Sequence, residues 1–209
     1  MSSASENLIT HPQGPQPGPG LASSADWLAY FNRLPGGLAV WIFCVLEMGT
    51  FALFFVGFAW SYRSEPTVFT ASQALLHPDS GTLNTLVLLS GSWLAARGVW
   101  ASQHGRPLAP WFYATACSGL LFLGIKLWEY QSVFATAVSL STNTFWFYYL
   151  FLTVVHALHV AFGVFFMLWL AWPRRQQSPE QALRVSAAAV YWHLVDVIWI
   201  FLFPLIYLL

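Results

Sequence analysis

The residues best suited to chemistry lie inside long apolar stretches of the chain. The last stretch contains His193 and Asp196, which are three residues apart and therefore share one face of a helix. Glu47, His156 and His159 lie inside two other apolar stretches. An ionisable side chain inside a membrane span is energetically costly, so each of these residues needs a partner.

Depth along the predicted spans brings these residues together. Glu47 and Asp196 each lie about ten residues into their spans, or about 15 Å at 1.5 Å per residue, and His193 lies one turn shallower than Asp196. His156 and His159 lie near the middle of theirs. We therefore expect one buried polar network, with Glu47 paired to His156 or His159 and Asp196 paired to another histidine.

Three functions compete for this network. Haem ligation needs histidines on different helices, but His156 and His159 share a helix and only His193 offers a partner across the bundle. A transport or proton path could use such residues, although five helices without repeats or broken segments make a poor transporter. The third alternative, favoured on physical grounds, is a network that fixes helix register in a protein that binds a larger complex.

A second charged set occurs near the outer end of the third predicted span. Lys126 and Glu129 are three residues apart, which permits an ion pair within one helix. A self-neutralising pair near the interface explains them at least as well as a functional site. Cys44 and Cys117 have no partner at a metal or haem-attachment spacing, and we expect both to be buried apolar fillers.

Composition identifies an integral membrane protein. The chain is 57% hydrophobic and 8% charged, with a mean hydropathy of +0.59, whereas soluble domains are about 25% charged. We predict an all-α, polytopic bundle of five transmembrane helices, spanning residues 37–62, 82–101, 110–130, 144–172 and 186–209. Residues 1–25 are predicted to be a disordered tail rich in proline and glycine, and residues 26–209 a single membrane domain.

The distribution of arginine predicts the orientation. Only Arg63 falls on the outer side of the predicted spans, and the remaining arginines fall on the N-terminal side: Arg33, Arg97, Arg106, Arg174, Arg175 and Arg184. Positive charge accumulates on the cytoplasmic side of membrane proteins. The N-terminus is therefore predicted to be cytoplasmic and the C-terminus periplasmic. No basic stripe suggests a nucleic-acid partner.

Several motifs resemble subunit III of the haem-copper oxidases. Residues 192–203, which read WHLVDVIWIFLF, are similar to the signature that ends this subunit. Four other segments resemble family motifs in the same order: Glu47 with Phe51, Phe54 and Phe55; Leu83-Asn84-Thr85 with Leu88 and Ser90; Lys126 with Glu129 and Tyr130; and His156-Ala157-Leu158-His159-Val160 with Gly163. The resemblance runs from about residue 34 to residue 209.

The chain resembles a short branch of that family. Large versions have seven helices, and the first two are not matched here. Phe147-Tyr148-Tyr149, followed by Leu152 and Thr153, resembles the five-helix proteins associated with bacterial nitric oxide reductase. The short third subunits of bacterial cytochrome c and quinol oxidases are the other match.

The resemblance implies a subunit of the bacterial inner membrane without a redox centre. Haem and copper would belong to the catalytic subunit I, which this chain would bind and support in stability and proton uptake, with membrane phospholipid as a further ligand. Glu47 would be the buried family glutamate, and His156, His159, His193 and Asp196 the polar positions of the bundle. Lys126 and Glu129 would lie near the outer surface, and no residue of this chain would be catalytic or bind a metal or cofactor.

Overall fold

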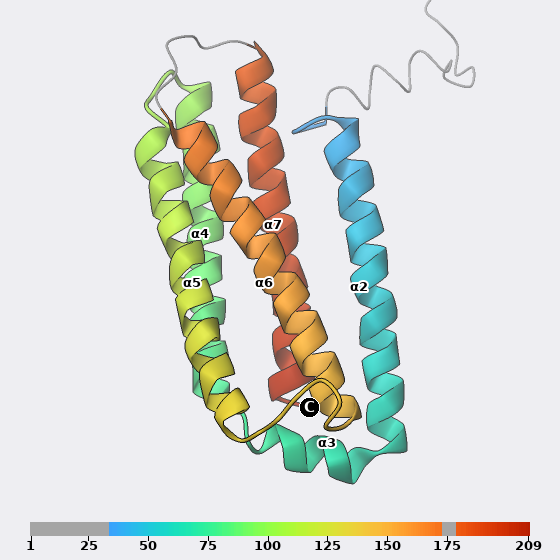
Figure 1. Ribbon diagram of the computed structural model, residues 1–209. Helices are drawn as coiled ribbons and strands as arrows, with labels where there is room; N and C mark the ends of the chain where they lie inside the picture. Colours follow the sequence, from blue (N-terminus) through green and yellow to red (C-terminus); the bar gives the residue numbers. More distant parts are fainter. Residues whose placement is uncertain (1–33, 173–178) are drawn as a thin grey trace, which may run out of the picture. The chain divides into compact units, whose positions relative to one another are not determined.

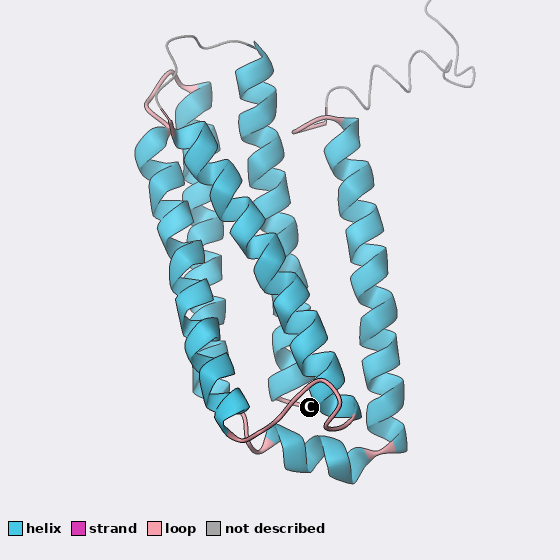
Figure 2. Ribbon diagram, viewed as in Figure 1, coloured by secondary structure: helices cyan, strands magenta, loops and turns pink. Residues whose placement is uncertain are grey.

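The described part of the chain consists of helices and short connections. The computed structural model describes residues 34–172 and 179–209; the predicted tail, 1–25, lies outside them. Six helices follow one another, and no strand occurs in these ranges: α2 (Leu38–Ser64), α3 (Pro66–Gln73), α4 (Pro78–Gln103), α5 (Ala109–Ala135), α6 (Thr144–Ala171) and α7 (Pro179–Tyr207) (Figure 2).

Local sequence explains where several helices begin. Pro66 and Pro78 occupy the first positions of α3 and α4, where a missing N–H costs no helical hydrogen bond. Asn143 caps α6, because its side chain accepts a hydrogen bond of 3.0 Å from the backbone N–H of Trp146.

The long helices form a bundle in which α4, α5, α6 and α7 pack closely and α2 lies at one side (Figure 1). Helix α4 packs against α5 and α7, and α6 also packs against α5 and α7. Helix α2 packs less extensively, against α7, α6 and the short α3, which runs across the end of the bundle. Many of the large side chains of α2 are exposed, including Val45, Leu53 and Trp60.

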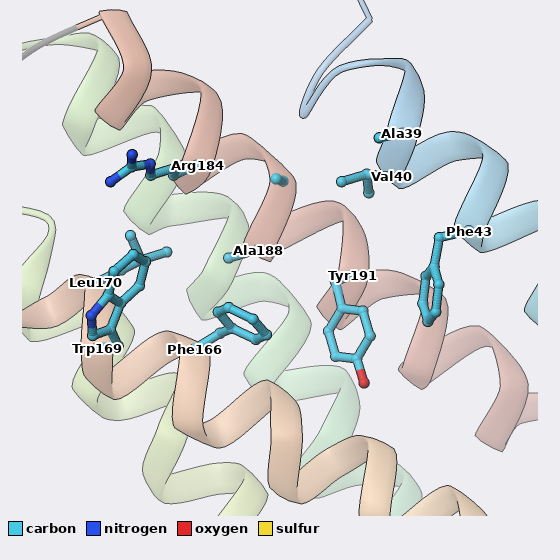
Figure 3. Close-up of a pocket in the computed structure, with 10 residues that line it drawn as sticks. Ala39, Val40, Phe43, Phe166, Trp169, Leu170, Arg184, Ala188 and Tyr191 are labelled. Carbon is cyan, nitrogen blue, oxygen red and sulfur yellow. The ribbon is translucent and has the colours of Figure 1, made fainter.

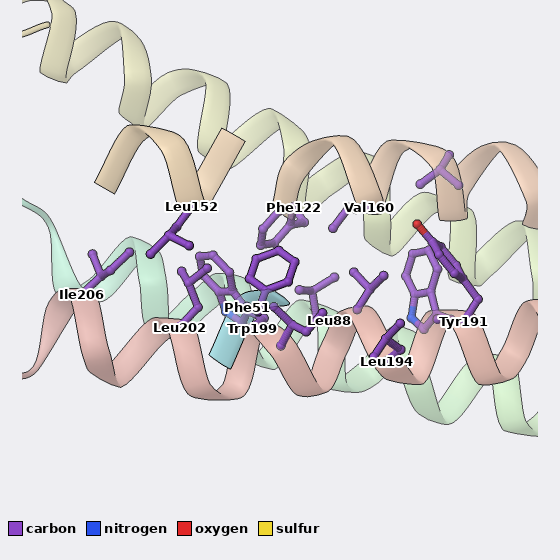
Figure 4. Close-up of a cluster of buried hydrophobic side chains, with 14 of the residues drawn as sticks. Phe51, Leu88, Phe122, Leu152, Val160, Tyr191, Leu194, Trp199, Leu202 and Ile206 are labelled. Carbon is purple, nitrogen blue, oxygen red and sulfur yellow. The ribbon is translucent and has the colours of Figure 1, made fainter. Parts of the chain in front are cut away.

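The core of the bundle is aromatic and aliphatic (Figure 4). Trp199 lies at its centre with its ring perpendicular to that of Phe122, at a centroid distance of 4.9 Å. Trp192 is also buried, and a Cβ added at Gly119 would lie 2.7 Å from its ring. Glycine at this position therefore leaves room for the Trp192 ring and for Val164 of α6, which would also be too close to such a Cβ.

The predicted helices are present, with some differences in extent. Four are long and apolar enough to cross a membrane: 38–64, 109–135, 144–171 and 180–207. Helix α4 is 26 residues long but less apolar. The predicted loop after the first span is wrong in part, because it contains α3 and because α4 begins at Pro78 rather than Thr82. Cys117 was expected to be buried but is exposed, because it lies on the outer face of α5.

Candidate functional site

The largest polar cluster among the described residues surrounds the carboxylate of Glu129. Lys126 Nζ donates to Glu129 Oε1 at 3.1 Å and to the Tyr207 hydroxyl at 2.9 Å. The same oxygen, Oε1, accepts from the hydroxyls of Tyr149, at 2.6 Å, and Tyr207. Ser80 donates to the other oxygen, Oε2, at 2.9 Å. We call these five residues the Glu129 network; it connects α4, α5, α6 and α7.

The ion pair within this network is buried. Lys126 is 1% exposed and Glu129 is 0% exposed. Aromatic rings surround the ammonium, with Tyr130 and Tyr149 at centroid distances of 4.9 and 5.0 Å and Trp199 at 5.8 Å. A desolvated cation is stabilised by the negative face of such rings. Opposite charge, hydrogen bonds and ring contacts together compensate for the removal of both groups from water.

The contact within this pair matches the expectation, since Lys126 and Glu129 form an ion pair along one helix. The pair lies level with Ser80 near the start of α4 and with Tyr207 at the end of α7. Its face turns into the bundle, so both side chains are buried, which the spacing alone did not show. Sequence reasoning missed Ser80 and Tyr207 altogether. Hydroxyl groups inside otherwise apolar helices were the available signal.

Glu47 and His159 form a second site, between α2 and α6. Glu47 Oε2 lies 3.5 Å from His159 Nε2, and both side chains are about one-fifth exposed, at 24% and 20%. The ring of Phe51 covers the imidazole edge-on at 5.9 Å. This is one of the two pairings predicted for Glu47.

The contact made by the second ring nitrogen of His159 fixes the tautomer of the neutral imidazole. His159 Nδ1 lies 2.8 Å from the carbonyl oxygen of Val155, which can only accept. Nδ1 therefore carries a hydrogen, and neutral His159 presents a lone pair at Nε2 towards Glu47. A favourable contact requires one further proton, held either by the carboxylate or by the imidazole.

His193 and Asp196 form a third group with α4. His193 Nδ1 lies 3.1 Å from the Ser92 hydroxyl, and the same hydroxyl lies beside the Asp196 carboxylate. Among the described residues no ion pair joins Asp196 to a histidine; instead, His193 and Asp196 both lie beside the Ser92 hydroxyl of α4.

His156 does not join any of these groups. It is fully buried, and neither ring nitrogen has a hydrogen-bond partner in the described ranges. Its ring lies 5.2 Å from that of Trp199 and 5.5 Å from that of Phe122. The five residues expected to form one network therefore occupy three separate places. The reason is the rotation of each side chain about its helix axis. On α6, His159 points towards α2 and His156 towards α5 and α7. On α7, both polar positions point towards Ser92 of α4.

An apolar pocket lies between α2, α6 and α7, at the end of the bundle where α2 begins (Figure 3). Its volume is about 330 Å³. Phe43 and Tyr191 face each other across it at 5.9 Å, and Arg184 lies at one end. Among the described residues, no three His, Cys, Asp or Glu side chains gather as a metal site.

Comparison with known proteins decides the family. The family model described as cytochrome c oxidase subunit III matches residues 37–209. The chain belongs to the cytochrome c oxidase subunit III family. The family resemblance inferred from the motifs is therefore confirmed, and with it a multi-pass membrane protein.

Relatives of this family member come from several bacteria. It is 36% identical to the cytochrome c oxidase subunit 3 of Synechocystis sp. over 177 residues, covering 80% of this chain and 73% of that protein. Its identity to the subunit of the same name in Thermostichus vulcanus is 37%, covering 61% and 65%. It is 26% identical to the quinol oxidase subunit 3 of Bacillus subtilis, covering 82% and 86%.

Proposed function

We propose that this chain is a non-catalytic third subunit of a haem-copper terminal oxidase in a bacterial inner membrane. The family match over residues 37–209, which includes nearly all described residues, carries this proposal. Relatives named as subunits of cytochrome c oxidase and quinol oxidase support oxygen as the terminal electron acceptor. Association with nitric oxide reductase stays a prediction from the Phe147-Tyr148-Tyr149 segment alone.

The arrangement of the histidines supports a subunit without its own haem. Bis-histidine ligation needs imidazole nitrogens from different helices facing each other across a gap wide enough for the macrocycle. His159 is directed to Val155 and Glu47, and His193 to Ser92. The His156 ring is packed against two aromatic rings. Haem and copper are therefore assigned to the catalytic subunit I.

Helix α4 is proposed as the fifth membrane span. Its 26 residues extend about 39 Å, more than the roughly 30 Å hydrocarbon core. Its low hydropathy reflects small and polar residues buried against α5 and α7, while Leu83, Leu86 and Leu89 are exposed. Arg97 lies 4.9 Å from the ring of Trp100, a pairing typical of the membrane interface. We place this end in the cytoplasm, and the lipid-exposed apolar faces contact membrane lipids.

Purification from the native membrane tests the proposed function. A tagged chain is expected to copurify with a haem-copper subunit, giving oxidase haem bands, copper and oxygen consumption with cytochrome c or quinol. Nitric oxide consumption would instead favour the reductase association. Recovery of the chain alone, without a haem-copper partner after crosslinking, would contradict the proposal. A haem band in the chain freed of partners would favour a small b-type cytochrome, and a colourless solitary chain an assembly or transport factor.

A further inference from the structure

A groove opens between α4 and α5 at the end of the bundle where α4 begins. Its volume is about 630 Å³. Exposed His77 and Asp79 give it a polar mouth, and Ser80 lies deeper. The remaining wall is mostly apolar and includes Leu83 and Trp128.

Ser80 connects this groove to the buried ion pair. It lines the groove, is 9% exposed, and donates to Glu129 Oε2 at 2.9 Å. One side chain therefore lies between the groove and the Glu129 network.

Asn84 lies one helical turn beyond Ser80 on the same face of α4. It is 0% exposed, and neither its amide nitrogen nor its carbonyl oxygen has a hydrogen-bond partner among the described residues. Buried side-chain amide groups rarely lack a partner, and where no protein group supplies one, a bound water commonly does. An orphaned pair of donor and acceptor atoms inside a core is therefore itself a sign of a ligand.

The helix register places Asn84 close to the ion pair and to the groove. Antiparallel contacts between α4 and α5 occur at Ser80 with Glu129 and at Gly91 with Thr115. Interpolation between these contacts puts Asn84 opposite Gly124, which lines the groove and lies two residues before Lys126 on α5. Side chains at positions i and i+4 have Cβ atoms about 5–6 Å apart, a separation that one water can bridge.

We propose that Asn84 and Ser80 bind ordered water that enters from the groove and solvates the Lys126–Glu129 pair. Buried waters commonly make about three hydrogen bonds. Asn84 supplies both a donor and an acceptor, and the Ser80 hydroxyl and Glu129 carboxylate supply further sites. The Glu129 network is thus connected to the aqueous phase at the end of the bundle that carries His77 and Asp79. This inference does not depend on which complex contains the chain.

A cryo-electron microscopy map of the full-length chain in its native complex tests this directly, at a resolution that resolves bound waters. Density for water is expected within about 3 Å of the Asn84 side chain. A dry Asn84 in a map that shows waters elsewhere would overturn the proposal. Elongated density filling the groove as far as Asn84 would also overturn it, because an amphiphile would then occupy the path.

A substitution of similar size provides an independent test, because the two alternatives predict opposite changes in the melting temperature. If Asn84 is dry, Asn84→Leu removes an unpaired amide and raises the melting temperature of the complex. If Asn84 binds water, the same change is expected to lower it by about 4 °C, since the water loses its main partner. Thr85→Val is the control, because it removes the 3.0 Å hydrogen bond from Trp199 to the adjacent residue without touching the proposed water. An unchanged or raised melting temperature for Asn84→Leu contradicts the proposal.

Discussion

At the scale of single residues, one carboxylate joins most of the bundle. Glu129 accepts hydrogen bonds from three other helices as well as from Lys126. Removing one member of a buried ion pair leaves an uncompensated charge, which costs about 3–5 kcal/mol. We therefore expect Lys126→Met to lower the free energy of unfolding by about this amount, as measured by denaturation in mixed micelles.

The double variant separates charge compensation from packing. Combining Lys126→Met with Glu129→Gln removes both charges, so most of the lost stability should return. Arg184→Met is a matched control, because its ion pair with Glu180 is solvent-exposed and worth at most about 1 kcal/mol. Equal losses in the single and double variants would show that the buried charges are not coupled.

The pair of Glu47 and His159 has a different expected role. It lies at the side of the bundle and is partly exposed, so its loss should not unfold the chain. We expect Glu47→Ala to preserve assembly but to lower oxygen turnover and proton uptake of the complex, because it removes the carboxylate that faces His159 inside the predicted span. Glu65→Ala, at the exposed end of α2, is the control. Unchanged turnover and proton uptake in Glu47→Ala would leave only a packing role.

At the scale of helices, close packing depends on glycines that face a neighbour. A Cβ at Gly119 would collide with Trp192, whereas one at Gly124 on the same helix would meet nothing within 4 Å. Gly119→Ala is expected to lower the free energy of unfolding of the protein by about 1–3 kcal/mol. Gly124→Ala should be neutral or stabilising, because alanine favours helix by about 1 kcal/mol. Thermal unfolding of the two variants checks the difference, and equal effects would contradict this account of the contact.

Much of the helical content follows from apolar runs, but the contacts between helices do not. Runs of about twenty apolar residues predicted α2, α5, α6 and α7 because lipid requires internal backbone hydrogen bonding. Helix α3 was missed because it is short and polar. Depth alone suggested a shared cluster for His156 and Asp196; rotation about each helix axis, which depends on packing, separates them. The Glu47–His159 pair was predictable from the matching depth of the two residues in their spans. The Lys126–Glu129 pair was predictable from its three-residue spacing on one helix.

At the scale of the whole molecule, the number of times that the chain crosses the membrane depends on whether α4 is a membrane span. Ala74 and Gln103 flank this helix and are exposed. In a variant whose native cysteines are replaced by alanine, we expect Ala74→Cys to react with an impermeant thiol reagent from the periplasm only. Gln103→Cys should react only from the cytoplasm. Ser141→Cys, in the exposed α5–α6 connection, should behave like Ala74→Cys. Reaction of both flanking positions from the same side would show that α4 does not cross.

The ion pair inside α5 also bears on how the protein is made. Helices of a membrane protein enter the bilayer from the ribosome in turn, and α5 precedes the tyrosines of α6 and α7 that complete its hydrogen bonds. Because Lys126 and Glu129 lie three residues apart on one helix, each can neutralise the other before those helices exist. Translocation of α5 therefore needs no later partner. Tyr207, on the last of the described helices, then completes the hydrogen bonds of the Glu129 carboxylate.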